Sequence, residues 1–436
     1  MALVGCGENG VVLEYDLTIA STDGGSVFPA AGTHTYQQGQ TVNVKATPAS
    51  EFYEFVNWTG ADAGELADAN AAETSITMNG DYSITANFQA LPWDEQITLT
   101  LHPTISQFAS ICGEVIFPWV DEVNALEGPD GGTFNVELVT PGDSPYDAAS
   151  SLSAITLGTT DIGMLSPETF HLGGAGYLPF AFDSIEQSAY VMYNLFTEDN
   201  GKWDAEGQLD GVKILITMPL WGSQLWTTAA GGEVDEASDL QGLKIRTDAQ
   251  YVESATYAAL GAVPTFLGVA DLAGSLESGV IDGCFFTYSG IGGAADLGPV
   301  TAHTTELNLI YRPYSLAMNV DAYEALPADA KAALDSVSGA DASVSWATAH
   351  IAAEEGDRDD TIDGPCAYSG PPFPCNDRNT EYGRPITVPD LSSFIAATAN
   401  VATDWAAYLE DPDEGPLMDG TGILARIDAL KAAYGG

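Results

Sequence analysis

The spacing of apolar residues changes near residue 90, and this change predicts two kinds of fold in one chain. Between residues 11 and 89, apolar side chains alternate with polar ones in three runs. These runs are Tyr15, Leu17 and Ile19, then Val42, Val44 and Ala46, and finally Tyr82, Ile84, Ala86 and Phe88. A period of two is typical of half-buried strands, and Gly-rich turns separate the runs. We expect a small β-rich domain over residues 11–89 and a Pro-containing linker over residues 90–95.

From residue 96 onward, strand-like runs alternate with helical ones. The expected strands are residues 97–101, 134–138, 161–164, 212–218 and 243–246, and the expected helices are residues 108–126, 146–157, 251–260 and 270–278. This alternation predicts α/β lobes with mostly parallel sheets and right-handed crossovers. Two such lobes place a binding site in the crevice between them. We therefore expect residues 96–436 to form a two-lobe α/β domain.

The C-terminal third is predicted to be helical, with one interruption. An Ala-rich helix is expected over residues 328–355, and amphipathic helices over 388–434 with a break at 411–420. Residues 356–384 are charged and rich in Gly and Pro, which predicts a surface insertion. Cys366 and Cys375 bracket a Pro/Gly-rich stretch there and predict a local disulfide, which needs an oxidising compartment. A zinc site is the alternative, but His and further Cys ligands at useful spacing are lacking.

The charge balance excludes several classes of partner. The chain has 436 residues with 12 Lys and Arg against 62 Asp and Glu, a formal net charge of −50. Nucleic-acid binding needs clustered basic residues, and adsorption to anionic lipid needs the same. We expect neither, and interpret the acidic surface as solvated and self-repelling. The 45% of hydrophobic residues is enough to build cores.

The first residues predict a lipid anchor. Leu3-Val4-Gly5-Cys6 looks like a bacterial lipobox, in which the Cys is lipid-modified and becomes the first mature residue. Only five residues precede Cys6, fewer than an export signal needs, so we interpret residues 1–10 as the remnant of such a signal. A chance Cys is the alternative. No other stretch reaches the roughly 18 apolar residues of a membrane span, so the anchor is the expected membrane contact.

Arg246 is the leading candidate for a ligand-binding residue. It ends the run Asp239-Leu240-Gln241-Gly242-Leu243-Lys244-Ile245-Arg246, where a strand end would point it into the cleft. A guanidinium presents a planar set of donors that matches a carboxylate bidentately. The alternative is an ordinary strand-end Arg in a surface ion pair.

Several short motifs occur with this run in a fixed order. They are Gly158-Thr159-Thr160-Asp161-Ile162-Gly163, Tyr177-Leu178-Pro179-Phe180, Leu260-Gly261-Ala262-Val263-Pro264 and Leu276-Glu277-Ser278-Gly279-Val280-Ile281-Asp282-Gly283. The ordered set resembles the solute-binding proteins of TRAP (tripartite ATP-independent periplasmic) transporters over roughly residues 95–434. The resemblance implies a type II periplasmic-binding-protein fold and an organic-acid ligand held by Arg246. It also implies an extracytoplasmic location and a TRAP membrane permease as partner.

The N-terminal β-rich segment carries a second resemblance. Its pattern around Gly24-Gly25-Ser26-Val27, Phe55-Val56-Asn57-Trp58 and Thr77-Met78-Asn79-Gly80-Asp81-Tyr82 is similar to an internalin-type B-repeat module, a divergent bacterial surface repeat. The resemblance implies a β-grasp-like domain that acts as a spacer or an adhesive unit.

Further candidate ligand contacts follow predicted strands. They are His102, Ser166, Trp221, Gln224, Trp226, Phe286 and Tyr288. His102 is equally compatible with a solvated loop, and one of the two Trp residues with the core. Many family members have a second Arg near residues 221–226, where this chain has Ser223 and Gln224. The resemblance therefore implies a monocarboxylate with an apolar or aromatic body, rather than a dicarboxylate held by two Arg.

The sequence offers no set of residues for catalysis. It contains no H-E-x-x-H and no G-x-S-x-G pattern, so it predicts neither a metalloenzyme nor a serine hydrolase. We expect no enzyme activity, no cofactor and no metal. The predicted function is capture of an organic acid for a TRAP permease. A surface adhesion or ligand-sensing protein that reuses this fold is the alternative, since a B-repeat is unusual on transport receptors.

Overall fold

The computed structural model describes residues 13–49, 53–90, 92–104, 111–140, 143–198, 203, 207–220, 222–248, 251–289, 291, 297–363, 386–413, 415–416 and 418–435. The chain divides into two compact units. One unit comprises Met1–Gln96 together with Glu127–Thr133 and Asp321–Ala333, and the second comprises the remaining residues.

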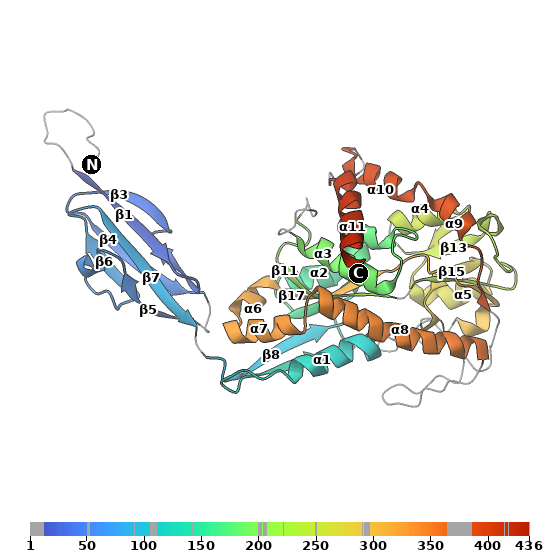
Figure 1. Ribbon diagram of the computed structural model, residues 1–436, viewed down its shortest axis with the longest axis horizontal. Helices are drawn as coiled ribbons and strands as arrows, with labels where there is room; N and C mark the ends of the chain where they lie inside the picture. The colour runs from blue at the N-terminus through green and yellow to red at the C-terminus, as the bar shows by residue number, and fades with distance from the viewer. Residues whose placement is uncertain are drawn as a thin grey trace. The chain divides into compact units, whose positions relative to one another are not determined.

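The first unit contains two β-sheets (blue in Figure 1). The four-stranded sheet has the order β3-β1-β7-β5, and the three-stranded sheet has the order β2-β4-β6. The strands are β1 (Glu14–Ser21), β2 (Gly25–Phe28), β3 (Gly32–Gln37), β4 (Thr41–Pro48), β5 (Tyr53–Thr59), β6 (Glu73–Thr77) and β7 (Tyr82–Ala90). The central strands β1 and β7 pair in parallel, and their outer neighbours pair antiparallel.

The predicted alternation buries one face of each sheet. Leu17 of β1, Val44 of β4 and Ile84 of β7 lie in one apolar cluster, so the two sheets pack on each other. Trp58 also lies in this core, and its indole N–H donates to the Ala71 carbonyl at 3.0 Å. The central parallel pair is the feature shared with a β-grasp sheet. Within residues 13–90 as described, a second sheet covers that pair in place of a helix.

Trp93 ties the start of the α/β part to a nearby loop. Its side chain is buried against Gly128 and Gly132, where an added Cβ would lie 2.5 and 2.2 Å from the indole ring. The Gly132 N–H donates to the Trp93 carbonyl at 3.1 Å. The glycines therefore allow a close approach that any side chain would block.

We predict that a chain beginning at Leu91 keeps the stability of the α/β part, because Trp93 is retained. A chain beginning at Ile97 should lose about 3–5 kcal/mol of unfolding free energy, the usual effect of removing a buried Trp side chain. Urea denaturation of both truncated chains measures the difference. Equal stability of the two would show that Trp93 does not hold the loop.

The first α/β lobe is built on a five-stranded sheet of order β11-β17-β10-β8-β9. Its strands are β8 (Gln96–His102), β9 (Thr133–Leu138), β10 (Ile162–Leu165), β11 (Val212–Pro219) and β17 (Pro313–Asn319), and its helices are α1 (Phe117–Asn124), α2 (Ala148–Thr156) and α3 (Ile185–Thr197). A π-helical turn, Cys112–Ile116, leads into α1.

The second lobe is built on a six-stranded sheet of order β14-β13-β15-β12-β16-β18. Its strands are β12 (Gln224–Thr227), β13 (Lys244–Thr247), β14 (Val263–Phe266), β15 (Gly283–Phe286), β16 (His303–Thr305) and β18 (Ile386–Thr387), and its helices are α4 (Tyr251–Ala259) and α5 (Leu272–Glu277).

Both lobe sheets are mostly parallel, as predicted, and each contains one strand that runs antiparallel to its two neighbours. Strand β17 runs antiparallel to β10 and β11, and β12 runs antiparallel to β15 and β16. The physical reason is that the chain passes between the lobes after β11 and returns before β17. A strand that enters from the other lobe needs no helical crossover within its own sheet, so its direction is not fixed by one.

The remaining helices are α6 (Val320–Ala325), α7 (Ala328–Ser336), α8 (Ala340–Asp363), α9 (Ser392–Thr398), α10 (Val401–Glu410) and α11 (Gly420–Tyr434). The predicted Ala-rich helix is interrupted at Gly339, whose φ of +101° suits glycine. Helix α8 (orange in Figure 1) then continues to Asp363, past Gly356, where the insertion was predicted to begin. The rest of that predicted insertion, including Cys366 and Cys375, lies outside the described residues.

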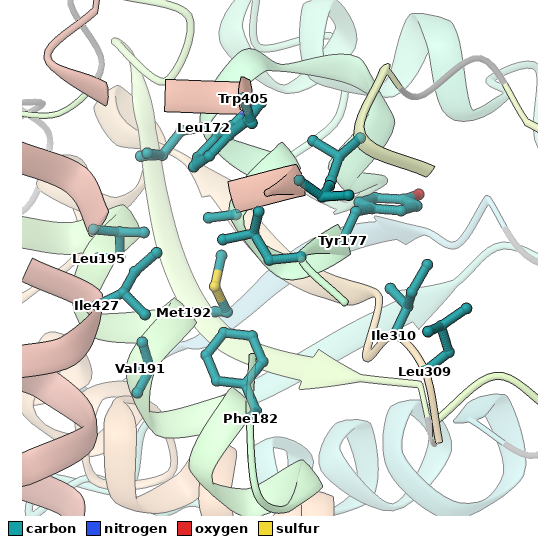
Figure 2. Close-up of a cluster of buried hydrophobic side chains, with 14 of the residues drawn as sticks. Leu172, Tyr177, Phe182, Val191, Met192, Leu195, Leu309, Ile310, Trp405 and Ile427 are labelled. Carbon is teal, nitrogen blue, oxygen red and sulfur yellow. The ribbon is translucent and has the colours of Figure 1, made fainter. Parts of the chain in front are cut away.

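The largest apolar core joins helices to both lobes. Figure 2 shows Met192 and Leu195 of α3 with Ile427 of α11 and Trp405 of α10. The same cluster includes Tyr257 and Phe285 of the second lobe. None of the described helices is long and apolar enough to cross a membrane.

Candidate ligand-binding site

Two segments carry the chain between the lobes, and they lie side by side. Their described residues are 219–220 with 222–224, and 306–312. The Leu220 N–H donates to the Arg312 carbonyl at 2.8 Å, and the Ser223 N–H donates to the Ile310 carbonyl at 3.0 Å. An added Cβ on Gly222 would lie 2.6 Å from the Asn308 Cα, so glycine is needed for this approach. Polar side chains on these segments are therefore held at the junction of the lobes.

Gln224 braces these two segments. It was predicted to lie in a loop, but it is fully buried in the short strand β12. Its amide donates to the Gly222 carbonyl at 2.7 Å and to Asn308 Oδ1 at 2.6 Å, and its Oε1 accepts from the Leu307 N–H at 2.8 Å. The polar atoms of Gln224 are thus engaged within the protein.

The guanidinium of Arg246 is buried and has no ion-pair partner among the described residues. The residue is 8% exposed, and its Nε–H donates to the Leu267 carbonyl at 3.0 Å. Among the described residues, none forms an ion pair with Arg246 or accepts a hydrogen bond from its terminal nitrogens. A buried charge ordinarily has a partner. Arg246 can therefore receive an anion without breaking an ion pair with these residues.

Three predicted aromatic residues lie in the sheet that contains Arg246 or directly after one of its strands. Arg246 of β13 is opposite Cys284 of β15, which is in turn opposite Trp226 of β12. Trp226 contacts Tyr288 edge to face, with ring centroids 5.8 Å apart, and its indole N–H donates to the Phe286 carbonyl at 3.1 Å. Phe286 thus lies on the strand next to that of Arg246, whereas Trp226 and Tyr288 are fully buried in an apolar cluster of this lobe. Trp221, also predicted, lies outside the described residues.

A second buried guanidinium belongs to Arg312, which the sequence analysis missed. It is 7% exposed and lies 5.6 Å from the centre of the Tyr177 ring. Its Nη1 donates to Ser223 Oγ at 2.8 Å, and its Nη2 forms an ion pair with Glu253. Its Nε lies 3.7 Å from Asp248 Oδ2. In contrast to Arg246, Arg312 is therefore paired with carboxylates.

Glu253 is fully buried in the first turn of α4 and has four donors. Besides Arg312, these are the Tyr257 hydroxyl at 2.8 Å, the Thr247 hydroxyl at 2.9 Å and the Asp248 N–H at 2.8 Å. Burial alone would raise its pKa, but the charge of Arg312, hydrogen bonds with Asp248 and the charge of Arg246 hold the pKa at about 2. Glu253 is therefore ionised at neutral pH.

Asp248 responds to the same surroundings in the opposite direction. Burial and the nearby Glu253 carboxylate together raise its pKa to about 7, against the lowering effect of Arg312. Below about pH 7 the pair therefore holds one proton, which is on Asp248, because Glu253 stays ionised. Below about pH 7, the group formed by Arg246, Arg312, Glu253 and Asp248 carries one net positive charge.

The predicted residues of the first lobe, His102 and Ser166, have their own surroundings in the described structure. His102 ends β8, where its Nδ1 lies 3.1 Å from Ser144 Oγ and its ring packs on Tyr146. Burial lowers the pKa of His102, so the neutral form is favoured at pH 7. Ser166 follows β10 and is buried. No hydrogen bond joins either residue to Arg246 in the described part of the chain.

A pocket of about 180 Å³ lies near the buried charges of Arg312 and Glu253. It is lined by Glu168, Thr169, Phe170, His171, Tyr251, Trp405, Tyr408 and Leu409. Glu168 lies between this pocket and the buried charges. The Tyr177 hydroxyl donates to Glu168 at 3.4 Å, and the guanidinium of Arg312 lies 5.6 Å from the centre of the Tyr177 ring. Within the described residues, no three His, Cys, Asp or Glu side chains are placed to hold a metal ion.

The chain forms two α/β lobes that are joined by adjacent crossing segments. A buried guanidinium without an ion pair among the described residues lies near the junction. These features define the class of two-lobe solute-binding proteins. Residues 124–363 match the family described as bacterial extracellular solute-binding protein, family 7 (DctP). The chain belongs to this family, whose members are the periplasmic solute receptors of TRAP transporters, a transport family and not an enzyme family. Residues 15–92 match the divergent InlB B-repeat domain.

Individual relatives are distant. The chain is 26% identical over 211 residues to the C4-dicarboxylate-binding periplasmic protein DctP of Rhodobacter capsulatus. The aligned residues make up 47% of this chain and 60% of that relative. The chain thus matches less than two thirds of the relative's length.

Solved structures show the same fold at low identity. A TRAP solute-binding protein from Rhodoferax ferrireducens with copurified benzoate has a TM-score of 0.63 and 19% identity, over 78% of this chain and 98% of that one. A marine metagenome protein with metahydroxyphenylacetate has a TM-score of 0.62 and 21% identity, over 78% and 100%. A Bordetella bronchiseptica protein with mandelate has a TM-score of 0.61 and 20% identity, over 78% and 99%.

Proposed function

We propose that this protein captures an organic monocarboxylate with an apolar or aromatic body and delivers it to a TRAP membrane permease. The observation that carries the proposal is the guanidinium of Arg246, buried and without an ion pair among the described residues. A carboxylate bound there gains charge-assisted, bidentate hydrogen bonds in a site that excludes water.

The surroundings of Arg246 support an apolar ligand body. Phe286 lies on the neighbouring strand β15 and packs against the buried rings of Trp226 and Tyr288, and aromatic rings favour contact with other rings. Benzoate, metahydroxyphenylacetate and mandelate, found in three structures of similar fold, are aromatic monocarboxylates. The Rhodobacter capsulatus relative is named for C4-dicarboxylates. A dicarboxylate ligand is disfavoured because the polar atoms of Gln224 form hydrogen bonds to the crossing segments instead of facing a second carboxylate.

A thermal-shift screen against organic acids tests the proposal, since a ligand that binds only the native state raises the melting temperature. Aromatic monocarboxylates should give the largest shifts. If no organic acid raises the melting temperature, or if sugars or amines do so instead, the proposal is wrong.

We also propose that the protein is extracytoplasmic and lipid-anchored through Cys6, with the B-repeat module as a spacer and Cys366 joined to Cys375. Mass analysis of the mature N-terminus tests the anchor, and mass mapping of unreduced peptides tests the disulfide.

A second candidate function is surface adhesion or ligand sensing, and the observation that supports it is the B-repeat match over residues 15–92. Neighbouring permease genes would support transport, and neighbouring kinase genes would support sensing.

Binding should depend on pH through Asp248. The charged and titratable groups around it are Glu253, Arg312, Arg246, Tyr177, Tyr257 and Tyr314. An anion on Arg246 favours the protonated form of Asp248, so its pKa rises above about 7 when ligand binds. Affinity should therefore be highest below that pH and fall about three- to tenfold between about pH 6 and about pH 8.

Titration calorimetry of the acid found in the screen, across this pH range, measures the effect. Asp248→Asn should remove the pH dependence while keeping the affinity of the acidic form. A wild-type affinity that rises with pH would contradict this assignment.

A further inference from the structure

The two buried arginines at the junction of the lobes differ in one respect. Arg246 and Arg312 are 8% and 7% exposed, and both act on the charges of Asp248 and Glu253. Arg312 has an ion-pair partner in direct contact, whereas Arg246 has none among the described residues. A site with two guanidinium groups that lack ion pairs would suit a ligand with two carboxylates. In this site only Arg246 lacks an ion pair among the described residues, so it suits one carboxylate.

The partner of Arg312 is fixed in place. Glu253 is held by the Tyr257 and Thr247 hydroxyls and by the Asp248 N–H, in addition to Arg312. Asp248 also faces the guanidinium, with its Oδ2 3.7 Å from Nε. A ligand carboxylate that approached Arg312 would have to displace a buried carboxylate with four donors. That displaced charge would be left unpaired, which is strongly unfavourable.

We propose that Glu253 and Asp248 act as a built-in counter-anion for Arg312 and thereby restrict the site to ligands with one carboxylate. This proposal rests on the proposed function, because it assumes that Arg246 receives the ligand. It assigns specificity to residues that occupy the second arginine, rather than to the absence of such an arginine. Glu253 and Asp248 are therefore positioning residues that set the charge of the site.

The charge count shows why one substitution is not enough. In Glu253→Gln, Asp248 loses the neighbour that raises its pKa, so it ionises and pairs with Arg312 instead. In Asp248→Asn, Glu253 remains in contact with Arg312. Only Glu253→Gln combined with Asp248→Asn leaves two uncompensated guanidinium groups.

The experiment compares acids that differ by one carboxylate: benzoate with isophthalate, phenylacetate with homophthalate, and butyrate with succinate. Titration calorimetry gives both affinities for each pair on the full-length protein. In each pair for which binding is detected, the wild type should bind the monocarboxylate with about tenfold or more higher affinity than the dicarboxylate. The double variant should reverse this preference, whereas Glu253→Asp should retain it. The matched control is Glu277→Gln with Asp404→Asn, two exposed carboxylates on α5 and α10, and it should behave as the wild type.

A wild type that binds monocarboxylates, together with a double variant of unchanged preference, would overturn this inference and leave the proposed function standing. A wild type that prefers dicarboxylates would also overturn the inference, because the second guanidinium would then be available. A wild type that binds none of the acids would overturn both.

A second variant covers the case in which the double variant does not fold. Arg312→Met with Glu253→Gln removes both charges of the pair, a change that buried ion pairs often tolerate. Since Arg312 is not the anchor, monocarboxylate affinity should stay within about threefold of the wild type. A loss of about 30-fold or more in a folded variant would show that Arg312 binds the ligand, and the inference would be wrong.

Discussion

Replacing Arg246 with alanine should weaken binding of the organic acid by at least about 100-fold, equivalent to about 2.7 kcal/mol. The guanidinium is the one buried cation of the described junction without an ion pair, so the variant removes the charge that the ligand carboxylate needs. Hydrogen bonds to charged groups each contribute about 1.5–3 kcal/mol, and a bidentate contact loses two of them. Titration calorimetry with the best acid from the screen measures the loss.

Arg246→Lys should also bind poorly, because a point charge replaces a planar set of donors. The matched control is Arg426→Ala, which removes an Arg from α11 that pairs with Glu198 at 2.7 Å. That variant should leave the affinity unchanged. If Arg246→Ala binds as tightly as the wild type, the assigned site is wrong.

The largest effect on stability should come from Arg312→Met. This change leaves Glu253 charged, fully buried and without its cation, and breaking a buried ion pair from one side costs about 3–5 kcal/mol. Urea denaturation measures the loss. Arg312→Met with Glu253→Gln should recover most of it, because neither charge is then left alone.

The surface ion pair of Arg426 and Glu198 supplies the comparison, since the free energy of unfolding should fall by about 1 kcal/mol or less in Arg426→Met. If Arg312→Met were as stable as the wild type, Glu253 would have to find another partner or a proton. The account of the buried charges would then be wrong.

Much of the fold could be predicted from local patterns. The period of two identified β1, β4 and β7, and Leu17, Val44 and Ile84 are buried as that pattern requires. Arg246 could be singled out because a basic residue is rare in this chain and stands at a strand end. These signals depend only on near neighbours in the sequence, so one sequence is enough to detect them.

The rest depends on contacts between distant residues. Arg312 and Glu253 are separated by 59 positions, and neither belongs to a motif that indicates the other. The scarcity of basic residues applied to Arg312 as well, which stands between Tyr311 and Pro313, and this signal was missed. Gln224 and Trp226 were placed in a loop because the four residues of β12 are too short to show a period.

A crystal structure of the protein with its best-binding acid would locate the ligand carboxylate. We expect the carboxylate on the terminal nitrogens of Arg246, with Glu253 still in contact with Arg312. A carboxylate bound to Arg312 in place of Glu253, or a ligand bound away from Arg246, would contradict this expectation.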